Sequence, residues 1–228
     1  MNEHESSPTS EKLARLRYVY DSIYQLNYDD LIRYMNLVNE DEELFLAMSR
    51  MNPNEPASQY MKEFIKRLFN FLSGFYIVYD HCQSMINTCE DTDFIEVYNE
   101  ALTNYRDECN YLLIRDLRTI ITHIRIPPIT WTTRFSSTEQ SATITPKLKI
   151  DTLLEYDRIS PELRTSLASE GTERLSIPEM VHSHHQSFDK FYKQIFEMIP
   201  SVWSAEMKRA YDARAESSSN EITVENSD

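Results

Sequence analysis

The feature that most constrains the fold is an unbroken helical stripe of apolar side chains over residues 58–88. Apolar residues return there at every third or fourth position for about eight turns, and no proline interrupts them. A stripe of this length predicts one long helix in the core. Its members are Met61, Phe64, Ile65, Leu68, Phe71, Leu72, Phe75, Val78, Tyr79, Cys82, Met85 and Ile86.

Shorter stripes with the same period predict further helices on both sides of this one. Residues 11–51 predict two helices that meet near residues 27–29, followed by a short helix over residues 42–48. Residues 94–120 carry a second long stripe, which predicts a single helix. We expect that helix to pack antiparallel to the first, because the connection between them is short.

The pattern changes after Pro127 and Pro128, which end the second long helix. Residues 129–135 alternate apolar side chains with Thr and Arg, and residues 142–150 alternate in the same way. Two such runs separated by the polar residues 136–141 predict a β-hairpin with a polar tip.

The last part of the chain returns to helical patterns. Residues 153–167 predict a short helix and a loop, and residues 177–199 predict an amphipathic helix that Pro200 ends. A final helix is expected over residues 202–215.

Together these patterns predict a mainly α protein, an up-and-down helical bundle with a short β-hairpin insertion. The expected organisation is a disordered N-terminus at 1–10, a bundle core at 11–126, the hairpin insertion at 127–152, C-terminal helices packing on the bundle at 153–216 and a disordered tail at 217–228.

Composition excludes several classes of protein. The chain has only 2 glycines, which rules out glycine-rich phosphate-binding loops. Charged residues interrupt every long apolar run, so no membrane-spanning helix is expected, and the polar N-terminus predicts a cytoplasmic protein without a secretion signal. The three cysteines, Cys82, Cys89 and Cys109, lack metal-site spacing, and we expect reduced, mostly buried thiols.

Net charge limits any nucleic-acid role to one local region. The formal net charge is −14, so the whole molecule repels polyanions. Residues 106–134 are an exception, because they contain five arginines and only three acidic residues. A local site for an anion, such as RNA, is therefore compatible with the sequence.

Candidate chemistry is concentrated in the polar residues of the segment 111–129. On a helix, Asp116, Thr119 and His123 share one face, and Arg115 and Arg118 lie on the adjacent face. An aspartate that faces inward can orient a histidine, and an arginine fork can bind an anionic oxygen. The segment therefore predicts a convergent polar site.

The string from Arg118 to His123, RTIITH, resembles the arginine, four residues and histidine of HEPN-type helical domains. The resemblance covers residues 94–154. It implies metal-independent RNA cleavage by a homodimer without a cofactor, as in toxin–antitoxin or phage-defence pairs, with an antitoxin as a possible protein partner. By this resemblance His123 would be the general acid or base and Arg118 the phosphate clamp, supported by Arg115, Asp116 and Thr119.

Two departures from the family pattern favour a different interpretation. Thr119 stands where the family usually has Asn, Asp or His, and the earlier polar pair is Arg115 and Asp116. One alternative is a catalytically inactive HEPN-like interaction module, in which these cations interact with the last carbonyl groups and the dipole of the helix. The other is an unrelated helical scaffold that binds a partner chain.

A histidine cluster and the tyrosines each allow two interpretations. His182 and His185 lie one turn apart on the predicted helix beside His184, so they could bind a transition metal if a third ligand came from elsewhere, although ordinary surface and half-buried histidines fit the pattern better. The tyrosines of the first helices suit base stacking or, more commonly, the boundary of a helical core.

Overall fold

The computed structural model describes residues 8–49, 55–87, 92–108, 110–123, 127–136, 138 and 141–202. Within these ranges, the side chains of 8–13, 93, 108, 123, 170 and 198–202 lie outside the description. The described chain is mainly helical with a small antiparallel sheet, which confirms the predicted fold class. None of the described helices is long and apolar enough to cross a membrane.

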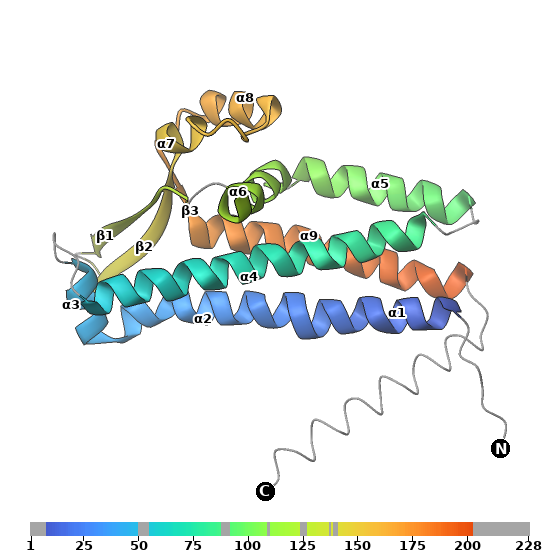
Figure 1. Ribbon diagram of the computed structural model, residues 1–228, viewed down its shortest axis with the longest axis horizontal. Helices are drawn as coiled ribbons and strands as arrows, with labels where there is room; N and C mark the ends of the chain where they lie inside the picture. The colour runs from blue at the N-terminus through green and yellow to red at the C-terminus, as the bar shows by residue number, and fades with distance from the viewer. Residues whose placement is uncertain are drawn as a thin grey trace, which may run out of the picture.

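Helix α4 (Glu55–Ile86) is the predicted long core helix. It runs the length of the bundle beside the N-terminal helices (Figure 1). Its fully buried residues include Phe64, Phe71 and Phe75, which follow the apolar stripe of the sequence. Cys82 on the same face is a buried free thiol, as expected, whereas Cys89 and Cys109 lie outside the described residues.

The predicted break near residues 27–29 is wrong. Helix α1 (Pro8–Val19), the π-helical segment η1 (Tyr20–Gln25) and α2 (Leu26–Glu40) follow one another without interruption (Figure 1). The side-chain amide of Asn27 donates a hydrogen bond to the carbonyl oxygen of Ile23 at 2.7 Å, so its polar group is satisfied within the helix. The short helix α3 (Glu42–Ser49) confirms the next prediction.

The second long stripe forms two helices, not the single helix that its period predicts. Helix α5 (Thr92–Glu108) ends before residue 110, and α6 (Tyr111–His123) leaves in a different direction (Figure 1). The change of direction places the ring of Tyr111 beside those of Phe75 and Tyr105 in the core, which favours the break. Helix α5 runs opposite to α4, but the helix that it contacts most is α9.

Helix α9 (Ile177–Val202) packs its apolar face into the same core through Phe188, Phe191 and Ile195. It continues two residues past Pro200, where the sequence predicted its end. The final helix expected at 202–215 lies outside the described residues, apart from residue 202 itself. Residues 1–7 of the N-terminal segment and the whole tail 217–228 also lie outside them.

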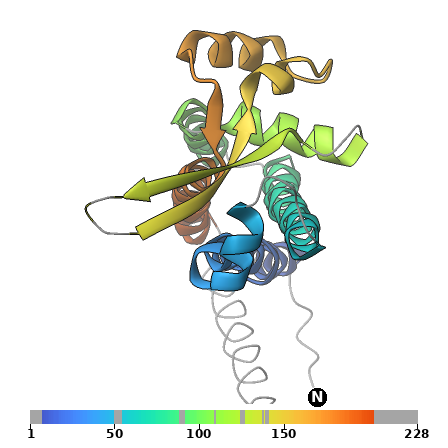
Figure 2. The same cartoon turned by 90° about the vertical axis from the view of Figure 1, so that its left-hand side faces the viewer.

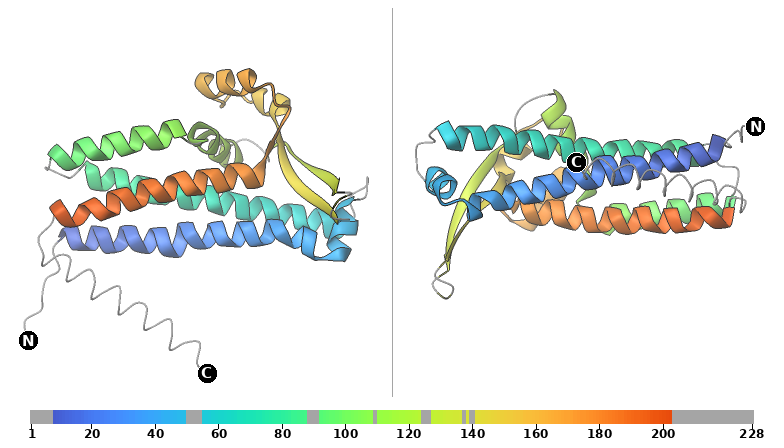
Figure 3. Two further views of the ribbon diagram at one scale, coloured as in Figure 1. Left: turned by 180° about the vertical axis from the view of Figure 1, so that it is seen from behind. Right: turned by 90° about the horizontal axis from the view of Figure 1, so that it is seen from below.

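The predicted hairpin is formed by β1 (Ile129–Ser136) and β2 (Ser141–Lys149). A third strand, β3 (Arg174–Ser176), extends the sheet to the order β1-β2-β3, with both pairs antiparallel. Three residues are too few to produce a recognisable alternation, so this strand was not predicted. The hairpin crosses the end of the bundle and reaches beyond it (Figures 2 and 3).

Two short helices connect β2 to β3, where the sequence predicted one helix and a loop. They are α7 (Ile150–Leu154) and α8 (Pro161–Glu170). The hydroxyl of Ser160 accepts a hydrogen bond from the backbone N–H of Leu163, and Gly171 ends α8 with a φ of 62°, in the left-handed region. Helix α8 contacts α6, the helix that carries the predicted polar site.

Candidate functional site

Asp116 on α6 is the most buried of the predicted site residues whose side chains the structure describes, with 4% of its surface exposed. One carboxylate oxygen accepts a hydrogen bond from Arg115 Nε at 2.8 Å. The other accepts one from the backbone N–H of Ser160 at 2.7 Å. Asp116 therefore joins α6 to the start of α8, and both of its oxygens are engaged.

Arg118 on the neighbouring face lies over an aromatic ring. Its guanidinium carbon is 4.2 Å from the centre of the Tyr76 ring, a cation–π contact between α6 and α4. Its Nε is buried and has no hydrogen-bond partner among the residues that the structure describes. Burial raises the pKa of the Tyr76 phenol above its ordinary value, so this ring stays neutral under the guanidinium.

The two threonines of α6 use their hydroxyls within their own helix. Thr119 donates to the carbonyl oxygen of Arg115 at 3.2 Å, and Thr122 donates to that of Arg118 at 2.7 Å. His123 is the last residue of α6, and its side chain lies outside the described part of the structure. The structure thus brings Arg115 and Asp116 into contact, and it does not test the predicted pairing of Asp116 with His123.

The histidines of α9 contact tyrosines of the N-terminal helices. His182 Nδ1 lies 2.8 Å from the hydroxyl of Tyr28, and His185 Nδ1 lies 3.3 Å from that of Tyr24. His184 is fully buried, and the described part of the chain gives its Nε2 no hydrogen-bond partner. Across the described ranges, no group of three potential ligands converges as a metal site requires. His182 and His185 thus lie at the boundary of the core, whereas His184 lies inside it.

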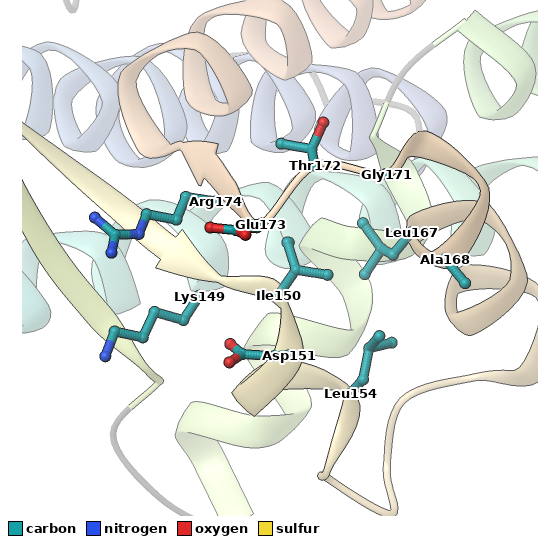
Figure 4. A pocket seen from close by; sticks show the side chains of 10 residues that line it. All are labelled: Lys149, Ile150, Asp151, Leu154, Leu167, Ala168, Gly171, Thr172, Glu173 and Arg174. Carbon is teal, nitrogen blue, oxygen red and sulfur yellow. The ribbon is translucent and has the colours of Figure 1, made fainter.

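A pocket of about 490 Å³ lies between β2, β3, α7 and α8, and the sequence did not predict it (Figure 4). Leu154, Leu167 and Ala168 form an apolar side. Lys149 and Arg174 lie on neighbouring strands at the edge of the pocket, and their side chains point side by side away from these apolar residues (Figure 4). Neither the third strand nor the turn at Gly171 has a sequence pattern strong enough to place these residues together.

In comparisons with known proteins, no protein-family model, no curated protein and no solved structure matches this chain significantly. The HEPN resemblance of the α6 motif therefore stays a prediction, and any function must be argued from the geometry.

Proposed function

We propose that the chain is a catalytically inactive binding module built on a HEPN-like helical bundle. The observation that supports this most strongly is the position of Asp116. Its two carboxylate oxygens already accept hydrogen bonds from Arg115 and from the backbone of Ser160. A carboxylate held in this way stabilises the junction of α6 and α8, and its orientation is set by Arg115 and Ser160.

The other polar residues of α6 support the same proposal. Thr119 donates its hydroxyl to a helix carbonyl, and the Arg118 guanidinium lies against the ring of Tyr76. The contact of Arg118 with Tyr76 holds α6 on α4, and the Thr119 hydroxyl is used within α6 itself. In this proposal the polar face of α6 is a structural joint, and the partner of the module, a protein chain, a second copy or an RNA, binds elsewhere on the surface.

A metal-independent ribonuclease is the second candidate, and one observation favours it. The Nε of Arg118 is buried without a hydrogen-bond partner, and the described residues offer its guanidinium no ion pair. An unpaired guanidinium near the end of a helix suits the binding of a phosphate oxygen. In this alternative the protein acts as a homodimer, with His123 as general acid or base.

The experiment that separates the two candidates is incubation of the purified protein with mixed RNA in EDTA. Arg118→Ala and His123→Ala remove the proposed catalytic groups, and Arg158→Ala is the matched control, because Arg158 is exposed on the loop before α8. Light scattering and circular dichroism verify the oligomeric state and folding of each sample.

The binding-module proposal predicts intact RNA with the wild type even at high protein concentration. Cleavage by the wild type and by Arg158→Ala, lost in both Arg118→Ala and His123→Ala, would instead establish the ribonuclease.

A further inference from the structure

One face of the three-stranded sheet carries only hydroxyl and cationic side chains. In an antiparallel sheet, every second residue of a strand and its cross-strand partner point to the same side. The register places eleven residues on this face, which we call the basic sheet face. They are Thr130, Thr132, Arg134 and Ser136 of β1, Ser141, Thr143, Thr145, Lys147 and Lys149 of β2, and Arg174 and Ser176 of β3.

The basic sheet face is accessible, whereas the opposite face of β2 is not. All eleven residues of the basic sheet face are at least partly exposed. On the other side of β2, Ile144, Pro146 and Leu148 are buried. The sheet therefore uses one face to pack on the protein and presents the other to solvent.

The charge of this face contrasts with that of the whole chain. The three strands contain four cations, Arg134, Lys147, Lys149 and Arg174, and no Asp or Glu, in a protein whose formal net charge is −14. The described part of the structure gives none of the four an ion pair.

Two of these cations face each other directly, at a cost to the sheet. Lys149 on β2 is the cross-strand partner of Arg174 on β3, and like charges in such positions destabilise a sheet. The nearest acidic residues along the chain, Asp151 and Glu173, lie beyond the ends of the strands at the pocket (Figure 4). A bound anion would relieve the repulsion between the two cations.

The spacing and chemistry of the face fit an extended polyanion. Lys147 and Lys149 are two residues apart, which places them about 7 Å apart along the strand, a distance comparable to that between neighbouring phosphates of an extended nucleic-acid strand. Threonine and serine hydroxyls bind phosphate oxygens, and they both donate to and accept from a ribose 2′-hydroxyl.

We propose that the basic sheet face binds the backbone of single-stranded RNA. The inference rests on the proposed binding function, and it names the ligand. Because the face carries no aromatic ring, it offers no platform for base stacking, so we expect binding that depends little on sequence and strongly on salt. The net charge of −14 permits RNA only where cations are locally concentrated, as they are here.

The test is fluorescence anisotropy of a labelled single-stranded RNA, titrated with the full chain at several salt concentrations in EDTA. The variant K147A/K149A removes two cations of the face. The matched control R33A/K62A removes two exposed cations of α2 and α4. Unlabelled single-stranded RNA, single-stranded DNA of the same sequence and an oligoglutamate peptide serve as competitors.

We expect the wild type and R33A/K62A to bind RNA alike, and K147A/K149A to bind on the order of tenfold more weakly at low salt. The slope of log affinity against log salt should fall in K147A/K149A by about 1.4, since each phosphate contact on a single strand contributes about 0.7. RNA should compete better than DNA.

Three results would overturn the proposal: no RNA binding by the folded wild type, equal weakening in both double variants, or displacement of the probe by oligoglutamate at lower concentrations than by RNA. The last result would identify an acidic protein segment as the ligand and leave the binding-module function standing. Metal-independent shortening of the RNA, lost in Arg118→Ala, would instead remove the proposed function itself.

Discussion

The side-chain amide of Asn39, near the end of α2, pairs with the backbone of Ile144 in β2. Asn39 Nδ2 donates to the Ile144 carbonyl oxygen at 3.1 Å, and the Ile144 N–H donates to Asn39 Oδ1 at 2.7 Å. The amide thus occupies backbone groups of β2 at a point beyond the reach of the short β3, which pairs only with residues 147–149. Asn39 both anchors the hairpin to the bundle and covers part of a strand edge.

Replacing Asn39 by alanine should therefore loosen the hairpin. The variant loses two hydrogen bonds, both to the backbone of the buried Ile144, and we expect the protein to lose about 1–3 kcal/mol of unfolding free energy. Urea denaturation measures this loss, and hydrogen exchange should show faster exchange at Ile144. The matched control is Asn104→Ala on the exposed face of α5, and an equal effect in both variants would contradict the anchoring role.

Burial of His184 predicts a pH dependence of stability. Burial lowers its pKa from the usual 6.5 to about 3. Between these values the unfolded chain binds a proton that the folded chain does not, so the free energy of unfolding should decrease as pH falls from 6.5 toward 3. The slope expected for one proton is about 1.4 kcal/mol per pH unit.

Denaturation curves at several pH values test this dependence. His184→Phe removes the titrating group among the rings of Phe71, Phe75 and Phe188 and should flatten the slope. His182→Gln, at an exposed position, should leave most of the slope in place. His185, whose pKa burial also lowers, accounts for a remaining part in the same direction. An unchanged slope in His184→Phe would show that His184 does not carry the effect.

Gly74 is required by the close approach of α4 to the π-helical segment. A Cβ at this position would lie 3.3 Å from the Cα of Tyr24, and that backbone atom cannot move without shifting η1. Alanine gains about 1 kcal/mol of helix propensity, but we expect crowding to outweigh it and to leave Gly74→Ala about 1 kcal/mol less stable. Gly74→Val should cost more. An alanine variant more stable than the wild type would disprove the close packing.

The thiol of Cys82 should be unreactive in the folded protein. The residue is completely buried, and burial raises its pKa to about 12, so very little thiolate exists at neutral pH. In the variant Cys89→Ser/Cys109→Ser, a thiol reagent should modify the protein only as fast as it unfolds. Rapid modification under native conditions would mean that α4 opens locally at this turn.

The sequence predicted the elements whose patterns are long and local. The stripe of α4, the short α3 and the alternating hairpin all formed where expected. The sequence did not predict the break between α5 and α6, because the break depends on tertiary packing. Tyr111 enters a cluster of rings from α4 and α5, and no glycine or proline near the break signals a turn. The chain also continues through residues 27–29 because Asn27 bonds to its own helix.

The candidate site was predictable in part. Helical geometry placed Asp116, Thr119 and His123 on one face, but it did not indicate whether Asp116 faces the protein or the solvent; the structure buries it. Its main backbone partner, Ser160, is 44 residues away, and no pattern in the sequence connects the two. The basic sheet face could not be predicted either, because its fourth cation, Arg174, lies on β3, a strand that the sequence pattern did not predict.

The unfolding free energy of Asp116→Asn decides whether the polar residues of α6 serve the structure. Asparagine keeps the size of the side chain but weakens its bonds to Arg115 and Ser160, so we predict a loss of about 1–3 kcal/mol in urea denaturation. The exposed control Asp157→Asn should remain within error of the wild type. Unchanged stability in Asp116→Asn, together with the loss of an RNA-cleaving activity that the wild type possesses, would contradict the account.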